Sequence, residues 1–179
     1  MAKPLQAATR KTLSGLFSAS DAAESAYRAC VDLGYEIGDV NVIVPEGRRQ
    51  EFLTSASEVK TELGKKKAEG GELGGPTGGR TGLLVTIFAA VGAAVAIPTI
   101  GIVAGPIAVA LTAAGAAGAA AGLISLLGDW GVPEDRVRHY ENAIRKGAIL
   151  ITVAVRSDAD ARRLEVEWKK LGGREIHYG

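Results

Sequence analysis

The chain has 179 residues with a formal net charge of +1, from 21 basic and 20 acidic residues. This length allows a small domain plus an appended segment, because cores become self-sufficient above roughly 60 to 80 residues. The balance of charges excludes a broad basic surface, so we expect no nucleic-acid partner. The single cysteine, Cys30, excludes an internal disulfide and a thiolate metal cluster, and its neighbours at helical spacing predict a buried, inert thiol.

Residues 11–45 have the pattern of a β-α-β unit. Residues 12–18 predict a short strand. Asp21 and Glu24 have the spacing of a capping box, which predicts a helix that begins there and ends near Gly34. Residues 40–45 then alternate with the period of a strand that Pro45 ends. We therefore expect the first half of a small α+β domain.

Residues 46–80 predict a polar, lysine- and glycine-rich linker. It carries consecutive lysines at 65–67 and many glycines, a composition that buries too little apolar surface to become ordered. Residues 74–81, GGPTGGRT, match the spacing of a phosphate-binding loop except that Arg80 replaces the lysine. Because no predicted strand leads into this loop, we do not expect a nucleotide site.

Residues 81–130 contain an uncharged, apolar run that predicts a helical hairpin. Pro98 and Pro106 divide the run, and since proline interrupts a helix interior, they predict a turn between two helices. Small residues four positions apart allow two helices to approach closely. The predicted helix-packing and assembly positions are Gly101, Gly105, Gly115, Gly118 and Gly122.

Two hypotheses for this hairpin remain open. Arg80 and Trp130 flank it and are candidates for a membrane interface, which favours insertion into a membrane or association with its surface. However, residues 81–97 are short for a span of about 20 residues, and the alanine-rich second arm is weakly hydrophobic. The alternative is a soluble homo-oligomer or filament whose hairpins pack against one another. The N-terminal segment lacks the apolar core of a secretory signal, so we expect a cytoplasmic protein. If it is associated with the inner membrane, both termini should face the cytoplasm.

The C-terminal part repeats the earlier pattern. Residues 131–147 predict an amphipathic helix opened by Pro133, and residues 148–179 predict a central strand, a helix and an edge strand. Asp158 and Asp160 lie where they can interact with the dipole of that second helix. The two halves together predict an α+β fold, a ferredoxin-like sandwich of four antiparallel strands interrupted by the apolar hairpin.

The sequence predicts no catalytic residue, metal site or cofactor. His139 and His177 are the only imidazoles, and neither has a second histidine or cysteine at metal-ligand spacing, so we expect solvated histidines. A third hypothesis places a small-molecule site between the sheet and the helix of residues 133–146. The sequence does not select its ligand.

The order of these elements resembles the bacterial general stress protein family, also called the heat-induced stress protein domain. The resemblance covers nearly the whole chain and is most specific in residues 131–153, where the matching residues are Gly131, Val132, Pro133, Glu134, Tyr140 and Gly147. It implies a stress-related, non-enzymatic role and brings no catalytic residues. The linker and the last strand depart from the family. Our leading hypothesis is that the glycine-zipper hairpin mediates membrane association, self-assembly or both.

Overall fold

The computed structural model describes residues 11–36, 39–48, 94–97, 100–114, 125 and 127–179. These residues form a mixed fold of α-helices and one antiparallel sheet, so the predicted α+β class is confirmed. The elements in chain order are β1 (Thr12–Phe17), α1 (Ser20–Asp32), β2 (Val40–Pro45), the 3-10 turn η2 (Glu46–Arg48), β3 (Ala94–Ile97), β4 (Gly101–Ala104), α4 (Pro106–Ala114), α7 (Glu134–Arg145), β5 (Ile149–Ala154), α8 (Asp158–Lys170) and β6 (Arg174–Tyr178).

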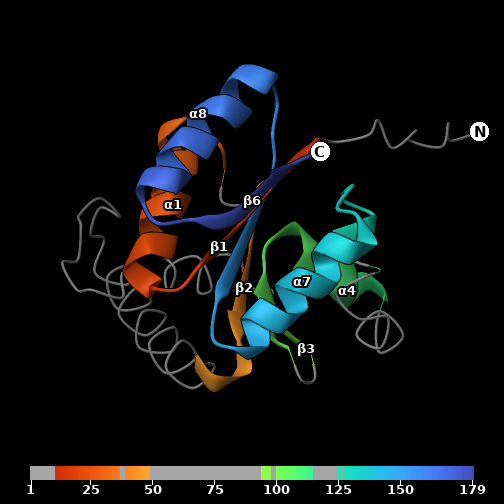
Figure 1. The fold of residues 1–179 in the computed structure, drawn as a ribbon. Helices are drawn as coiled ribbons and strands as arrows, with labels where there is room; N and C mark the ends of the chain where they lie inside the picture. The colour runs from red at the N-terminus through yellow and green to blue at the C-terminus, as the bar shows by residue number, and fades with distance from the viewer. Residues whose placement is uncertain (1–10, 37–38, 49–93, 98–99, 115–124, 126) are drawn as a thin grey trace, which may run out of the picture.

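The sheet has six strands in the order β3-β4-β2-β5-β1-β6, and each neighbouring pair is antiparallel. One β-α-β segment contributes β1 and β2, and the other contributes β5 and β6. The strands of the two segments alternate in the sheet, so that β5 lies between β1 and β2. Helices α1 and α8 cover one face of the sheet, whereas α4 and α7 cover the other (Figure 1). The predictions that the strand after α7 is central and that the last strand is an edge strand are confirmed.

The first hydrophobic core lies between the sheet and the pair α1 and α8. At its centre Trp168 is fully buried, and its indole Nε1 donates a hydrogen bond to the carbonyl oxygen of Ala26 at 3.0 Å. Phe17 contacts this ring edge-on with 5.7 Å between centroids. Gly15 leaves space for the indole of Trp168, because a Cβ added at Gly15 would lie 2.9 Å from that ring. These contacts fix α8 against the sheet and so position the start of β6.

The opposite face of the sheet carries a buried row of polar side chains. Asn41 and Thr152 are paired across β2 and β5, and the Asn41 Nδ2 donates to the Thr152 Oγ1 at 3.1 Å. The Asn41 Oδ1 accepts the backbone N–H of Ile107 at 2.8 Å, which satisfies an amide in the first turn of α4. Ser14, next in the row on β1, lies 2.8 Å from the hydroxyl of Tyr140 on α7. The row thus anchors α4 and α7 to the sheet.

The predicted helical hairpin is only partly correct where the structure describes it: residues 107–114 of its second arm lie in helix α4, whereas residues 94–97 of its first arm form a strand. Residues 94–97 and 101–104 pair as the antiparallel strands β3 and β4, and β4 adds to the edge of β2. Backbone hydrogen bonds to β2 favour the extended conformation there, and Pro106 is the first residue of α4 rather than part of a turn between helices. Pro98 and residues 81–93, 115–124 and 126 lie outside the described residues. Within the described part, no helix combines the length and apolar character needed to cross a membrane.

Gly101 and Gly105 were predicted to pack two helices together, but neither glycine lies in a helix. Gly101 lies in β4 with a φ of 143°, and a Cβ there would be 1.9 Å from the carbonyl oxygen of Val44. Gly105 has a φ of 112°, and its Cβ would be 2.4 Å from the carbonyl oxygen of Val40. Both glycines therefore allow their own segment of backbone to lie close to the backbone of β2, so they pack against a strand and not against a helix. Gly115, Gly118 and Gly122 lie outside the described residues.

One prediction about a helix start needs correction. Helix α1 begins at Ser20 after Ala19, and no side chain caps it, so Asp21 and Glu24 do not form a capping box. At the start of α8 the cap is Ser157, whose Oγ accepts the backbone N–H of Asp160.

The two carboxylates near the start of α8 also have long-range partners. Asp158 accepts hydrogen bonds from Lys11 and Tyr178, and Asp160 accepts one from the hydroxyl of Tyr35 at 2.8 Å. They tie the start of α8 to neighbouring segments, beyond their interaction with the helix dipole.

The two membrane-interface candidates have different outcomes. Trp130 is half-buried and packs against the second core, which lies under α4 and α7. Its carbonyl oxygen accepts a hydrogen bond from the Thr12 hydroxyl at 2.6 Å. Trp130 therefore contacts the protein's own core at this position, and its role at a membrane stays a prediction. Arg80 lies outside the described residues.

Candidate functional site

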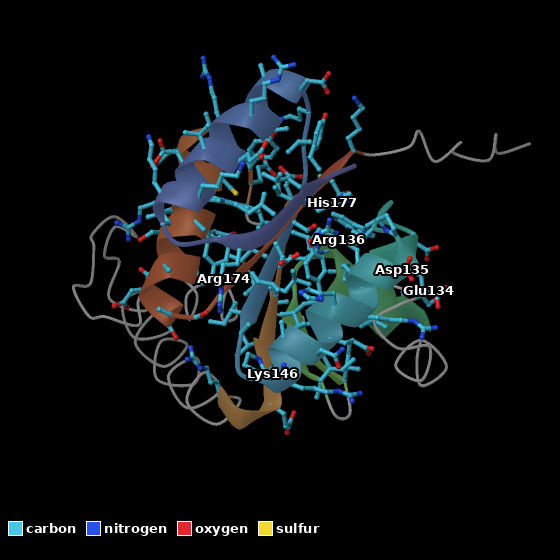
Figure 2. All side chains as sticks on the ribbon, viewed as in Figure 1. Glu134, Asp135, Arg136, Lys146, Arg174 and His177 are labelled. Carbon is cyan, nitrogen blue, oxygen red and sulfur yellow. The ribbon has the colours of Figure 1, made fainter. Side chains whose placement is uncertain are left out.

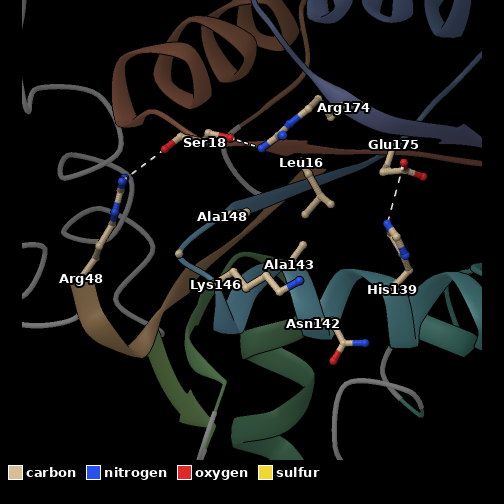
Figure 3. Close-up of a pocket in the computed structure, with 11 residues that line it drawn as sticks. Leu16, Ser18, Arg48, His139, Asn142, Ala143, Lys146, Ala148, Arg174 and Glu175 are labelled. Atoms are coloured by element: carbon tan, nitrogen blue, oxygen red, sulfur yellow. Dashed lines mark hydrogen bonds and ion pairs between the residues drawn. The ribbon is translucent and has the colours of Figure 1, made fainter.

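A cavity of about 370 Å³ lies between the sheet and the C-terminal half of α7 (Figure 3). Its apolar lining comes from Leu16 on β1, Ala143 on α7 and Ala148 before β5. Polar side chains surround this lining. They are Ser18, Arg48, Arg174 and Glu175 on the sheet side and His139, Asn142 and Lys146 on α7. The volume is within the range of about 300 to 1,000 Å³ typical of small-molecule sites.

Four turns of the chain meet at this end of the sheet. The segment after β1 supplies Ser18, and η2 supplies Arg48 directly after β2. Lys146 terminates α7 just before β5 and lies at the opposite end of the helix from Glu134 and Asp135 (Figure 2). The fourth turn, after α8, supplies Arg174 as the first residue of β6.

The sheet side of the cavity holds two arginines around one serine. Arg48 donates from Nη2 to the carbonyl oxygen of Ser18 at 3.2 Å and from Nη1 to the Oγ of Ser20 at 2.9 Å. Arg174 donates to the Oγ of Ser18 (Figure 3). All these acceptors are neutral, so they position the guanidinium groups without cancelling their charge.

Lys146 adds a third cation on the α7 side of the cavity. Within the described part of the chain, none of Arg48, Arg174 and Lys146 forms an ion pair with a carboxylate. The cavity is therefore electropositive and suits an anion.

The carboxylate in the lining belongs to Glu175, which has an unusual backbone conformation. Its φ is 51°, in the left-handed region that residues other than glycine rarely adopt. The register between β1 and β6 shifts here, between Ser14 and Leu16, as at a β-bulge. Bulges re-aim side chains, and strained backbone is concentrated at functional sites. The backbone conformation of Glu175 is thus a second observation, besides the cations, that indicates a functional site at this cavity.

Contacts from α7 hold Glu175 in place. Its carboxylate lies 3.0 Å from Nη1 of Arg136 and 3.8 Å from Nε2 of His139. Its carbonyl oxygen accepts a hydrogen bond from the hydroxyl of Tyr140 at 2.9 Å, and burial raises the pKa of this tyrosine. Tyr140 therefore remains neutral at physiological pH and links the bulge to the buried polar row.

The structure separates the two histidines. His139 lines the cavity, as Figure 3 shows, whereas His177 lies on β6 outside it. Burial and, to a smaller extent, the positive charge of Arg136 lower the pKa of His177. Within the described residues there is no group of three or more histidine, cysteine or carboxylate side chains that could hold a metal.

The position of the cavity agrees with the hypothesis of a site between the sheet and residues 133–146, but its cations were missed by sequence reasoning. Arg48 and Lys146 look like ordinary loop and helix-end residues, and Arg174 like a residue that follows a helix stop. A usable signal was available in the predicted topology. Basic residues follow β2, end α7 and begin β6, and these three points lie at the same end of an antiparallel sheet.

A second depression of about 560 Å³ lies between α1 and α8. Its lining is mainly apolar, with Leu33, Leu164 and Val166, and its charged residues are of both signs. This depression therefore favours no ligand of one particular charge.

Comparison with protein-family models, with curated proteins and with solved structures finds no match for this chain.

Proposed function

We propose that this chain contains a binding domain for a small anionic molecule, with its site in the cavity between the sheet and α7. The observation that carries the proposal is the convergence of Arg48, Lys146 and Arg174 from three separate elements on one cavity. Hydrogen bonds to Ser18 and Ser20 position the two arginines but leave their charge available. An anionic ligand would supply the missing negative charge and accept charge-assisted hydrogen bonds.

The test is calorimetric titration of the full chain with inorganic phosphate, sulfate, succinate and citrate. We expect at least one of these anions to bind, and Arg174→Gln to weaken that binding at least tenfold because it removes a charge and a rigid donor. Arg138→Gln is the matched control, since Arg138 lies on the exposed side of α7 outside the cavity lining and pairs with Glu134 at 2.6 Å. Absence of any anion binding at millimolar concentrations would refute the proposed function.

The scaffold of this site is, in our proposal, a ferredoxin-like sandwich. The strand order β2-β5-β1-β6, with α1 and α8 on one face, supports this interpretation. Strands β3 and β4 extend the sheet beyond β2. In this arrangement α7 lies on the face that a two-layer sandwich leaves open, and it provides the second wall of the cavity.

Self-assembly or membrane association, as part of the stress-related role, is a second candidate function. One observation favours it: α4 carries no charged residue, and Val109 is 53% exposed on it. An exposed apolar helix face is typical of a surface that contacts another molecule. Light scattering and flotation with lipid vesicles test the two versions. A monodisperse monomer that stays with the aqueous fraction would refute both.

A further inference from the structure

From the lining of the cavity we infer that the bound anion is a phosphate monoester carried by a polyhydroxy compound, such as a sugar or polyol phosphate. This inference rests on the proposed anion-binding function and specifies its ligand. Three properties of the lining support it: the set of donors and the elements that supply them, the net charge, and the other hydrogen-bonding groups.

The donors of the lining come from several separate elements of the chain. Arg48 approaches from η2, Arg174 from β6 and Lys146 from the end of α7. The Oγ of Ser18 accepts an N–H of Arg174, which leaves its own hydroxyl hydrogen free to donate to a ligand. A planar carboxylate is satisfied by a single bidentate arginine, whereas a phosphoryl group offers three terminal oxygens in a tetrahedral arrangement. The donor set therefore matches a phosphoryl group better.

The charge of the lining matches a dianion. Arg48, Lys146 and Arg174 contribute three positive charges and Glu175 one negative charge, which leaves a net charge of +2. A phosphate monoester carries about −1.5 to −2 charges at pH 7. Arg136, which pairs with Glu175 at 3.0 Å, adds positive charge just outside the lining.

The remaining lining favours a polyhydroxy carrier for this phosphate. The carboxylate of Glu175 accepts hydrogen bonds and the amide of Asn142 both donates and accepts them, as sugar hydroxyls require. An ammonium group fits less well, because Arg136 already pairs with Glu175. The lining holds no phenylalanine, tyrosine or tryptophan ring for a nucleobase to stack on, and His139 is its one aromatic side chain. Leu16, Ala143 and Ala148 offer an apolar surface to the carbon skeleton.

A phosphorylated polyol can be free in solution or can be the headgroup of a phosphoinositide lipid. The experiment therefore has two arms with the full chain. Calorimetry compares glucose 6-phosphate, inorganic phosphate and succinate. Flotation compares vesicles of phosphatidylcholine with and without phosphatidylinositol 4-phosphate. Binding in the first arm alone identifies a soluble ligand, and vesicle binding that glucose 6-phosphate displaces identifies a headgroup.

We expect the preferred phosphorylated polyol to bind at least tenfold more tightly than inorganic phosphate or succinate. Glu175→Gln should reduce its preference over inorganic phosphate to below threefold, and Arg174→Gln should weaken both phosphates at least tenfold. The control Arg138→Gln should change neither.

The two levels of the hypothesis fail differently. If succinate or inorganic phosphate binds as tightly as glucose 6-phosphate, and phosphatidylinositol 4-phosphate adds no binding to the vesicles, the ligand inference is overturned and the anion site stands. If no anion binds, the proposed function fails with it.

Discussion

Two buried tyrosines offer a matched test of the hydrogen-bond network that supports the cavity. Tyr140 and Tyr27 are both fully buried. The hydroxyl of Tyr140 donates to the carbonyl oxygen of Glu175 at 2.9 Å and lies 2.8 Å from the Oγ of Ser14. The hydroxyl of Tyr27 has no hydrogen-bond partner among the described residues. The change Tyr→Phe removes one oxygen at each site and leaves the ring in place, so it isolates the role of the hydroxyl.

The two substitutions should have effects of opposite sign. A net contribution of about 0.5 to 1.5 kcal/mol per hydrogen bond predicts that Tyr140→Phe costs about 1 to 3 kcal/mol. Tyr27→Phe removes a buried hydroxyl that has lost its water without gaining a partner, so it should stabilise the protein by about 1 kcal/mol. Burial raises the pKa of both tyrosines, which keeps both hydroxyls neutral and the comparison like for like.

Urea unfolding of the wild type and the two variants measures these differences. With a slope of about 2 kcal/mol per molar urea, a difference of about 2 to 4 kcal/mol should separate the midpoints of the two variants by roughly 1 to 2 M. The slope itself should not change, because neither substitution alters the surface exposed on unfolding. If Tyr27→Phe destabilises the protein as much as Tyr140→Phe does, the assignment of the network is wrong.

Three further measurements test other parts of the fold. Burial raises the pKa of Cys30 to about 12, so a maleimide at pH 8 should label it only after unfolding in urea, and rapid labelling of the native protein would contradict this. Asn41→Ala removes the hydrogen bonds to Thr152 and to the N–H of Ile107, so urea unfolding should show that the free energy of unfolding falls by about 1 to 3 kcal/mol. An unchanged midpoint would contradict a stabilising role of these two hydrogen bonds. NMR titration should give His177 a pKa below 6.5, because burial disfavours its charged form. Stability linked to His177 should then be complete above pH 6.5 and decline as the pH falls towards the folded-state pKa; a pKa above 6.5 would reverse this sign.

Local sequence patterns correctly predicted the central strand β5 and the helix α7, because the apolar pattern and the proline that indicate them lie within or next to these elements. The stretch that becomes β5 is apolar on both faces except for Thr152, and it pairs with a strand on each side. Pro133 directly precedes α7, as its position in the sequence predicts. The start of α1 was misplaced because a capping box is only a spacing: the N-cap is Ala19, two residues before Asp21, and no side chain caps the helix. Boundaries of this kind depend on hydrogen bonds whose geometry a sequence does not specify.

The segment around β3 and β4 shows where pattern alone fails. An uncharged stretch of alanine, valine, isoleucine and glycine has no clear period, so it is compatible with a buried helix or a buried strand. The exposed edge of β2 decides between them, because it offers backbone partners to β4. The four-residue spacing of Gly101 and Gly105 looks helical, yet each glycine avoids a different carbonyl oxygen of β2. The sequence correctly indicated close packing but not the element that is packed.

The cavity could be located from topology, whereas its most informative residue could not be recognised. A glutamate in the left-handed region costs on the order of 1 kcal/mol or more, and a glycine at position 175 would avoid that cost. A glycine could not place a carboxylate beside Arg136 and His139, in the lining of a cavity whose other charged side chains are those of Arg48, Lys146 and Arg174. Glu175 thus combines a strained backbone with the negative charge of the lining. In the proposed site, Glu175 neutralises part of the positive lining and can accept hydrogen bonds from hydroxyl groups, which is why we infer a polyol phosphate as the ligand instead of anions in general.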